Sequence, residues 1–237
     1  MQFHAPLIKG FLIKRYKRFM ADIELETGKS VTAHCPNPGS MLSINEPGSE
    51  VWLSPAKNAT RKLKFTWELI RTGGTLVGIN TQHPNTLVAE AIQNSQVIEL
   101  QGFSELKREV KYGENSRIDI LLKDAKKGLC YVEVKNVTMR RNLSKNAPIE
   151  FPDAVTTRGA KHLVELSDMV KSGHRAVMFY LVQREDGNGG VTIAHDIDPE
   201  YRKALDKAQS SGVEFLAYGC TVSTAEINVA NRLKFLG

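Results

Sequence analysis

Three side chains near the middle of the sequence have the types and the spacing that metal-dependent phosphodiester chemistry needs. Glu133 and Lys135 alternate with Val132 and Val134, and Asp119 lies fourteen positions before Glu133. Because successive side chains of a strand point to opposite faces, Glu133 and Lys135 project from one face while the two valines enter the core. Two carboxylates are the usual protein ligands of Mg²⁺, and a lysine beside them can orient the attacking water or neutralise charge on phosphorus.

The spacing between the two carboxylates predicts a β-hairpin. Fourteen positions suit two antiparallel strands joined by a loop at residues 123–128, and such pairing brings Asp119 and Glu133 within reach of one cation. We therefore predict that Asp119 and Glu133 bind Mg²⁺ or Mn²⁺ and that Lys135 is catalytic. The alternative is structural, because exposed Asp, Glu and Lys side chains are common on half-buried strands and a Glu-x-Lys alternation is also typical of cross-strand salt bridges.

The segment after the metal-binding strand is basic, which favours contact with a phosphate backbone. Four Lys or Arg residues and no acidic residue lie between Val134 and Glu150. A helix expected over residues 157–170 then places Arg158 and His162 on one face, where each could bond a phosphate. The alternatives are that the basic segment is a mobile charged loop and that His162 is a plain surface residue. The nucleic-acid contacts predicted for this half of the chain are Arg117, Arg140, Arg141, Lys145, Arg158 and His162.

The first third of the chain predicts a small β-barrel. Five short strands in about 70 residues favour an OB-fold, although an SH3-like barrel would show much the same pattern. Asn37, Ser40 and Met41, beside two prolines, are expected to form a structured turn rather than a site. The strands are expected at residues 18–25, 29–34, 50–53, 65–71 and 75–80. A mixture of basic and aromatic residues typical of a surface that binds single-stranded nucleic acid lies before and at the start of the first of these strands: Lys14, Arg15, Tyr16, Lys17, Arg18 and Phe19. Because side chains alternate along a strand, only part of this set can face one ligand.

The rest of the chain predicts an α/β domain. The apolar run at residues 176–182 is typical of a strand that is covered on both faces. We predict a mixed (α+β) fold in which an OB-like barrel over residues 1–82 precedes a domain over residues 83–237, whose mixed sheet is flanked by helices. Helices are expected from residue 85, over 157–170 and over 199–211, and strands over 103–111, 117–122, 129–134, 174–183, 213–218 and 226–235.

Composition bounds the partner and the compartment. The 237 residues are 41% hydrophobic and 24% charged, as in ordinary globular proteins, and their net charge is +6. Residues 1–80 hold eleven Lys and Arg against six Asp and Glu, so +5 of that charge lies in the predicted barrel. This asymmetry favours a polyanionic partner, DNA, although a solvated basic surface has the same composition. The three cysteines form no CxxC pair, and we expect no signal peptide and no membrane span, hence a cytoplasmic protein.

The order of the chemical groups along the chain resembles that of the PD-(D/E)XK nuclease superfamily: a helix carboxylate, a strand Asp, then Glu-x-Lys. Glu90 matches the helix carboxylate, with Glu99 as a nearby competitor, and Ile118 replaces the proline that precedes the strand Asp. More narrowly, the chain resembles the sugar fermentation stimulation protein A family. The stretches that carry this resemblance are His34–Met41, Arg117–Asp119, Tyr131–Thr138 and Phe151–Ala154.

The resemblance implies a function as well as a fold. It implies an OB-like front domain, a nuclease-like rear domain, DNA binding without strong sequence preference and a regulatory role in maltose metabolism. It places catalytic groups at Glu90, Asp119, Glu133 and Lys135. Two hypotheses follow, a Mg²⁺-dependent endonuclease and a non-catalytic DNA-binding regulator that keeps the fold but makes little use of the acidic pocket. The intact Asp, Glu and Lys favour the endonuclease, and the chain has no aromatic cluster that would support a sugar-binding barrel.

Overall fold

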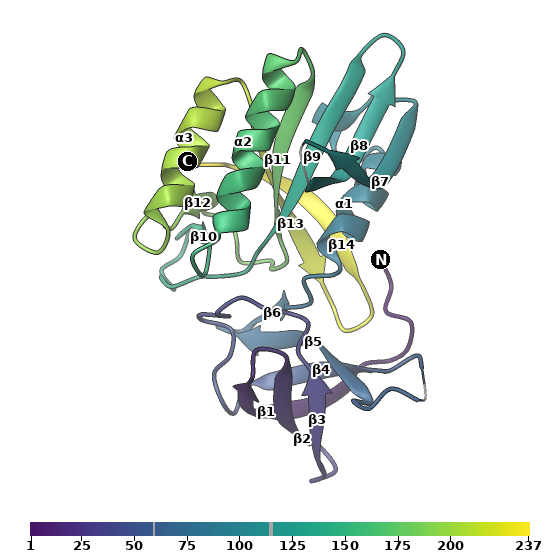
Figure 1. Cartoon of the computed structure of the whole chain (residues 1–237). Coiled ribbons are helices and arrows are strands. Elements are labelled where there is room, and N and C mark those ends of the chain that lie inside the picture. Colours follow the sequence, from purple (N-terminus) through teal and green to yellow (C-terminus); the bar gives the residue numbers. More distant parts are fainter. Residues whose placement is uncertain (59, 114–115) are drawn as a thin grey trace.

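The computed structural model describes residues 1–58, 60–113 and 116–237, which form a β-barrel and an α/β domain. In Figure 1 the barrel lies below and the α/β domain above, and the N-terminus lies beside the upper domain rather than within the barrel. The expected architecture, an OB-like barrel followed by a mixed sheet with flanking helices, is confirmed.

The barrel is one six-stranded sheet in the order β3-β2-β1-β4-β5-β6, which closes where His34 of β3 pairs with Thr66 of β5. The sequence pattern does not predict β1, because Phe11 and Ile13 are exposed on its outer face and apolar residues therefore occupy both faces. The strands are β1 (Ile8–Tyr16), β2 (Met20–Leu25), β3 (Ser30–His34), β4 (Glu50–Pro55), β5 (Phe65–Thr72) and β6 (Thr75–Gly78).

A tight turn between β1 and β2 displays two of the predicted basic side chains. Lys17 and Arg18 both have positive φ, 48° and 60°, and both are exposed. The strand expected to begin at Arg18 therefore begins at Met20 instead. Alternate residues of β1 and β2 are buried inside the barrel, among them Leu12, Ala21 and Ile23, whereas β4 and β5 are buried along most of their length, Trp67 and Ile70 included.

The α/β domain has a six-stranded mixed sheet in the order β14-β13-β11-β9-β8-β7. The central strands β9, β11 and β13 are parallel, and β7, β8 and β14 are antiparallel additions at the two edges. A short parallel pair, β10 with β12, is not predicted by the sequence pattern. The elements are α1 (Pro84–Gln93), β7 (Glu105–Tyr112), β8 (Ser116–Asp124), β9 (Gly128–Val137), β10 (Ile149–Phe151), α2 (Thr157–Lys171), β11 (Arg175–Val182), β12 (Val191–Ile193), α3 (Pro199–Ser210), β13 (Glu214–Val222) and β14 (Ile227–Leu233), with a 3₁₀ turn at Ile98–Leu100.

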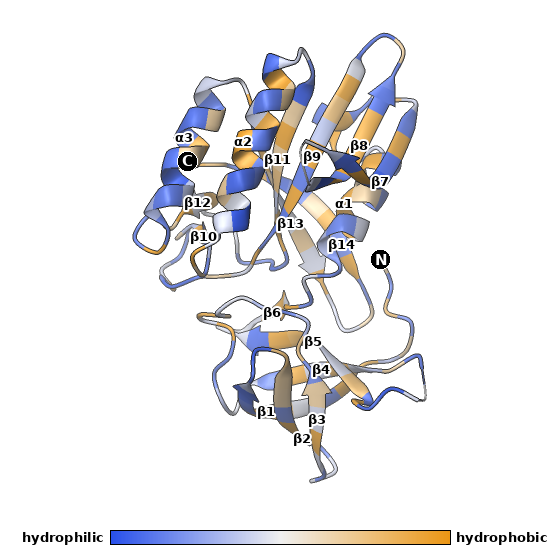
Figure 2. Cartoon of the chain, viewed as in Figure 1, coloured by the Kyte–Doolittle hydropathy of each residue, from blue (hydrophilic) through white to orange (hydrophobic). Residues whose placement is uncertain are grey.

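Helices cover both faces of this sheet. The apolar side of α1 packs on one face, and α2 and α3 pack on the other, so each face has its own buried cluster. Strand β11 contributes to both clusters, as its unbroken apolar run predicts, and Figure 2 shows hydrophobic colours along it while the helices alternate between hydrophobic and hydrophilic. Thr156 and Asp198 cap α2 and α3 by accepting backbone N–H groups, which fixes where these helices begin.

The two domains are tied together at several points besides the connecting chain. The first residues cross to the α/β domain, where the Phe3 amide donates to the Ala225 carbonyl oxygen (3.0 Å). The Gly78 amide at the end of β6 donates to the Gln183 carbonyl oxygen (2.9 Å). Within the described ranges, no helix is both long and apolar enough to cross a membrane.

Candidate active site

The β8–β9 hairpin builds the site as the spacing predicts. The strands pair from Asp124 opposite Gly128 to Ile120 opposite Val132. Val132 and the next alternate residue of β9 pack into the cluster under α1, so Glu133 and Lys135 face α2. The predicted division of faces along β9 is therefore confirmed.

Asp119 lies where the regular alternation of β8 breaks. Ile118 belongs to the cluster on the α2 side and Ile120 to the cluster on the α1 side, although regular alternation would place both on one face. On the neighbouring strand β7, Glu109 has a positive φ of 54°. The bend turns the Asp119 carboxylate towards β9, where its Oδ2 accepts the Val134 amide at 2.7 Å.

Asn85 in the first turn of α1 holds the other oxygen of this carboxylate. Its Nδ2 donates to Asp119 Oδ1 at 2.8 Å and to Glu109 Oε1 at 3.2 Å. The sequence pattern does not mark Asn85 as a site residue, because an amide at the start of a helix ordinarily caps it. Both Asp119 oxygens thus accept hydrogen bonds and the side chain is fixed in place.

Glu133 is the most buried charged group of the site, with 2% of its surface exposed. Its Oε1 accepts from Lys135 Nζ at 2.7 Å and is in close contact with His162 Nδ1. Its Oε2 is buried and has no hydrogen-bond partner. A buried carboxylate oxygen without a partner costs free energy, so this atom marks a position where a ligand is expected.

His162 lies inside the site rather than on its surface. It is 4% exposed, and its Nε2 accepts from Arg158 Nε at 3.3 Å. An imidazole that accepts at Nε2 carries its proton on Nδ1, where it donates to Glu133. The expectation that His162 bonds a phosphate is thereby corrected: packing of α2 against β9 buries it between Glu133 and Arg158, and only Arg158 is exposed.

The two carboxyl groups titrate in opposite directions. Burial, and then the charge of Glu133, raises the pKa of Asp119 to about 6. Burial also acts to raise the pKa of Glu133, but the Lys135 ammonium and the hydrogen bond from His162 outweigh it and hold that pKa below its ordinary value. The divergence is expected of two neighbouring carboxylates of which one has a cationic partner.

The donor set fits a hard divalent cation. No cluster of three or more His, Cys, Asp or Glu side chains suited to a metal occurs in the described part of the chain. Mg²⁺ and Mn²⁺ take carboxylate oxygens, and Mg²⁺ keeps several waters, so two carboxylates suffice. The residues that could hold such an ion are Asp119 and Glu133, the latter through its unpartnered Oε2.

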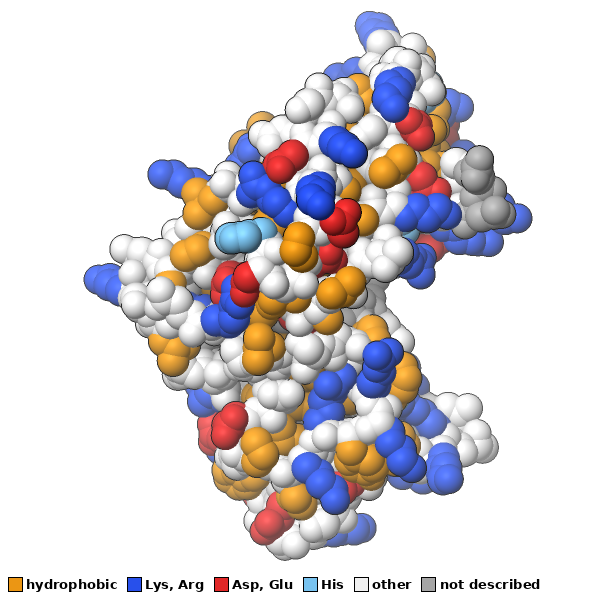
Figure 3. Space-filling view, turned by 60° about the vertical axis from the view of Figure 1, so that its left-hand side comes forward, with side chains coloured by type: hydrophobic (Ala, Val, Ile, Leu, Met, Phe, Trp, Pro, Cys, Tyr) orange, Lys and Arg blue, Asp and Glu red, His pale blue; other side chains and the backbone are white. Residues whose placement is uncertain are grey.

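The site opens into a cavity of about 550 Å³ between the two domains. From the α/β domain, Asn85, Lys135 and Arg158 line it. From the barrel come Arg18 and the turn at residues 37–39. Figure 3 shows the hollow between the domains, with Lys and Arg side chains gathered on the surfaces above and below it.

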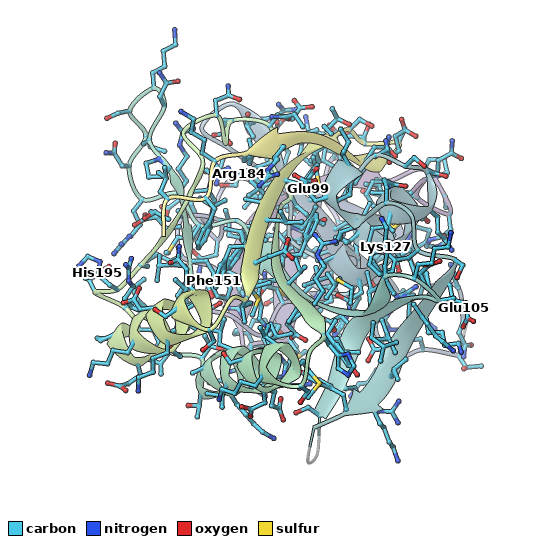
Figure 4. The ribbon with its side chains drawn as sticks, turned by 90° about the horizontal axis from the view of Figure 1, so that it is seen from above. Glu99, Glu105, Lys127, Phe151, Arg184 and His195 are labelled. Carbon is cyan, nitrogen blue, oxygen red and sulfur yellow. The ribbon has the colours of Figure 1, made fainter. Side chains whose placement is uncertain are left out.

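Glu90, the predicted helix carboxylate, is not part of this arrangement. It pairs with the amino group of Met1 at 3.1 Å. Five helical positions separate it from Asn85, which turns it about 140° away from the side of α1 that faces Asp119. Its competitor Glu99 accepts from the Tyr218 hydroxyl (2.6 Å) and lies across the sheet from Phe151, as the view from above shows (Figure 4). Neither glutamate reaches the site.

The basic segment after β9 is folded back rather than free. Met139 bridges to Glu150, and this turns Arg140 inward, where it is 8% exposed and forms an ion pair with Asp186. Arg141 is bound on both sides, by Glu150 and Asp196. Arg140 is therefore turned away from solvent, against the prediction that it contacts a phosphate backbone, whereas Arg141 stays at the surface between its carboxylate partners and its phosphate contact remains a prediction. Lys145 is exposed.

The basic residues of the barrel divide in the same way. Arg15 donates to the carbonyl oxygens of Asn37 (2.9 Å) and Gly39 (2.8 Å), so it supports the predicted turn and does not face a ligand. Lys14, Lys17 and Arg18 are exposed, and Lys14 lies over the Tyr16 ring at 5.5 Å. Arg117 of β8 is also exposed and donates to the Glu109 carbonyl oxygen (2.9 Å). Of these five basic side chains, only Arg18 lines the cavity.

Comparison with known proteins agrees with this architecture. Residues 13–79 match the family model described as "SfsA N-terminal OB domain", and residues 82–226 match "Sugar fermentation stimulation protein RE domain". The chain belongs to the sugar fermentation stimulation protein family. The first match settles the barrel as an OB domain and not an SH3-like one.

Relatives match over nearly their whole length. A sugar fermentation stimulation protein homologue of Rhodospirillum rubrum is 56% identical over 94% of this chain and 93% of its own. One of Paramagnetospirillum magneticum is 55% identical over 97% and 95%. Among solved structures, SfsA of Pyrococcus furiosus in complex with Ca²⁺ has the same fold, with a TM-score of 0.88, 24% identity, and coverage of 99% of this chain and 97% of that one.

Proposed function

We propose that this member of the family is a DNA-binding phosphodiesterase that depends on Mg²⁺ or Mn²⁺. The observation that carries the proposal is the Glu133 carboxylate, which is buried with Oε2 unpartnered, next to a second fixed carboxylate and to Lys135, which lines the cavity. A buried acceptor without a donor is costly in a merely structural network. The same atom is well suited to an ion that the fold is built to accept.

The roles of the side chains follow from their contacts. Asp119, held by Asn85 and the Val134 amide, and Glu133 would bind the cation. When bound, the cation supplies Lewis-acid polarisation of a phosphoryl oxygen and lowers the pKa of a bound water. Lys135 Nζ, tied to Glu133, would stand beside the reacting phosphate and stabilise the charge that develops on its oxygens. Arg158, at the cavity wall, would bind a neighbouring phosphate.

Two further features support the choice of ligand and partner. The Pyrococcus furiosus relative was solved with Ca²⁺, a hard divalent cation of the kind proposed here. On the barrel, Lys14, Lys17 and Arg18 are exposed beside Phe19, which is also exposed, and this mixture suits a nucleic-acid backbone with its bases. The three cysteines are buried and unpaired, which agrees with the reducing cytoplasm that we propose as the compartment.

One observation favours the second candidate, a DNA-binding regulator without catalysis. Lys135 and His162 already satisfy Oε1 of Glu133. A carboxylate neutralised by its own neighbours can persist without a cation, so the fold does not need the metal to be stable. Cleavage assays separate the two candidates.

The experiment is a cleavage assay on plasmid, linear duplex and single-stranded DNA with Mg²⁺ or Mn²⁺, against EDTA. We expect metal-dependent cleavage that Lys135→Ala abolishes, because loss of the ammonium removes charge stabilisation worth about 10²–10³ in rate. Lys161→Ala, which removes a half-exposed lysine of α2, is the matched control and should keep full activity. Intact DNA of all three forms with either ion would leave the regulator as the better account.

A further inference from the structure

We propose that the interdomain cavity admits single-stranded DNA, about one or two nucleotides at a time, and excludes the duplex. This names the substrate class of the same site and so rests on the proposed function. A cavity of about 550 Å³ falls in the range of about 300–1,000 Å³ that holds one small organic ligand, which is the size of a nucleotide. A duplex, whose two backbones flank a major groove about 12 Å wide, is too broad to enter such a space whole.

The lining has the chemistry of an unpaired nucleotide. Three cations reach it from different elements: Arg18, Lys135 and Arg158. The lining also includes apolar side chains, among them Val155, which is 71% exposed, and the half-buried Phe151. A single strand offers both phosphates and bare base faces, whereas a duplex stacks its bases inside and offers phosphates outward. A wall that combines cations with apolar groups suits the single strand.

Two acidic residues line the cavity, Glu150, which is neutralised by an ion pair, and Asp153, which is held in place by neutral donors. Glu150 pairs with Arg141. Asp153 accepts the Ser40 hydroxyl through its carbonyl oxygen (2.6 Å) and the Met41 amide through its carboxylate Oδ2 (2.9 Å). Lys135 shares its charge with Glu133, so the positive charge offered to a phosphate at the wall comes mainly from Arg18 and Arg158, opposed by the single Asp153 carboxylate.

The contacts of Asp153 also restrict entry. We call them the clasp: Asp153 of the α/β domain with Ser40 and Met41 of the barrel. The clasp ties the two walls at the cavity itself, near the connecting chain at Thr81 and in addition to the hydrogen bonds of Phe3 and Gly78 that also join the domains. The clasp would have to open before the walls could part around a duplex, whereas a single strand fits between them.

Gly39 shows how closely the clasp is fitted. A Cβ at this position would lie 2.6 Å and 2.8 Å from the two carboxylate oxygens of Asp153. Gly39→Ala should therefore displace the Asp153 carboxylate and loosen the clasp without removing a charge. Asp153→Ala removes the clasp carboxylate, and the two variants together separate loosening from a change in local charge.

The test uses a single reporter in the cavity. All three native cysteines are buried, so Val155→Cys can be labelled selectively with an environment-sensitive fluorophore. Val164→Cys, 55% exposed on the outer side of α2 and outside the cavity lining, is the matched control. Both are titrated in EDTA, so no cleavage occurs, with a 12-nucleotide single strand and with a blunt hairpin duplex of the same sequence.

We expect the single strand to change the Val155→Cys signal at a concentration at least tenfold lower than the duplex, with no change at Val164→Cys. Gly39→Ala and Asp153→Ala should each reduce that preference to threefold or less, with melting curves showing that the variants are folded. Equal or tighter occupancy by the duplex, or a single strand that leaves the Val155→Cys signal unchanged, would overturn the proposal. The titration in EDTA reports occupancy and not cleavage. Selective occupancy by the single strand, together with intact DNA in the separate cleavage assay, would refute the proposed function and leave this inference intact.

Discussion

The cation site can be tested by thermal stability without any assay of cleavage. A ligand that binds only the folded protein stabilises it by RT ln(1 + [L]/Kd), which is about 1.4 kcal/mol when the ion is at ten times its Kd. For a chain of this size each kcal/mol raises the melting temperature by about 2–4 °C. We therefore expect Mg²⁺ or Mn²⁺ to raise the melting temperature by about 3–6 °C at pH 7.5.

The pH dependence of this increment follows from Asp119, whose pKa is raised from 3.8 to about 6. Because the folded-state value lies above the unfolded one, proton binding stabilises the metal-free fold at low pH, and that contribution is lost as pH rises through about 6. Proton and cation compete for the same carboxylate. At pH 5 only about one molecule in ten has Asp119 ionised, so the apparent Kd rises about tenfold and the increment falls to about 0.4 kcal/mol.

Asp119→Asn should abolish the increment at every pH, because the amide removes the charge that the ion needs. Asp168→Asn is the control, since that carboxylate is exposed and pairs only with Lys171 on the surface of α2. Differential scanning fluorimetry across pH 5–8 measures all three proteins. A metal-induced shift that survives in Asp119→Asn, or one that grows as the pH falls, would refute the assignment of Asp119 as a ligand.

Three further outcomes are expected. DNA affinity should fall with salt, with a log–log slope of about −0.7 per phosphate contact for a single strand, and an affinity independent of salt would remove the electrostatic account. Arg140→Ala should lower the free energy of unfolding by about 3 kcal/mol, because it leaves the partly buried Asp186 short of one partner. Arg141→Ala should lower it by about 1 kcal/mol or less, because its ion pairs lie at the surface, and equal losses in urea titrations of the two variants would contradict this difference in burial. His162→Asn, which can keep a donor near the Nδ1 position, should retain more of the metal-induced stabilisation than His162→Ala, and identical melting increments would show that His162 does not position Glu133.

Alternation along β9 predicts much of the site. Because side chains alternate along a strand, Glu133 and Lys135 lie on the face opposite the two valines. The fourteen-residue spacing fixes the hairpin that brings Asp119 alongside Glu133. These are local rules, in which the position of a side chain depends on its own strand and on the partner across a short turn. They hold here because one face of the hairpin is buried under α1.

The parts that could not be predicted depend on contacts between distant segments. Arg140 belongs to a run of basic residues that is typical of a solvated loop, and only the position of Asp186, 46 residues later, shows that it is buried. Glu90 has the residue type that the family pattern requires, but the rotation of α1 brings Asn85 to Asp119 instead. Helical periodicity gives the relative positions of side chains around a helix but not the direction in which the helix turns them.

His162 combines both cases, and its position bears on the choice between nuclease and regulator. Its spacing from Arg158 places both on one helix face, as predicted, yet burial differs so much that one is exposed and the other is sealed against Glu133. A chain of contacts thus runs from Arg158 at the cavity wall through His162 to the carboxylate proposed to hold the metal. A protein that only binds DNA needs the arginine but has no use for this connection, because phosphate binding requires only an exposed cation. A nuclease needs this connection, because the group that binds the substrate and the group that holds the ion must be fixed relative to one another to within about 0.5 Å.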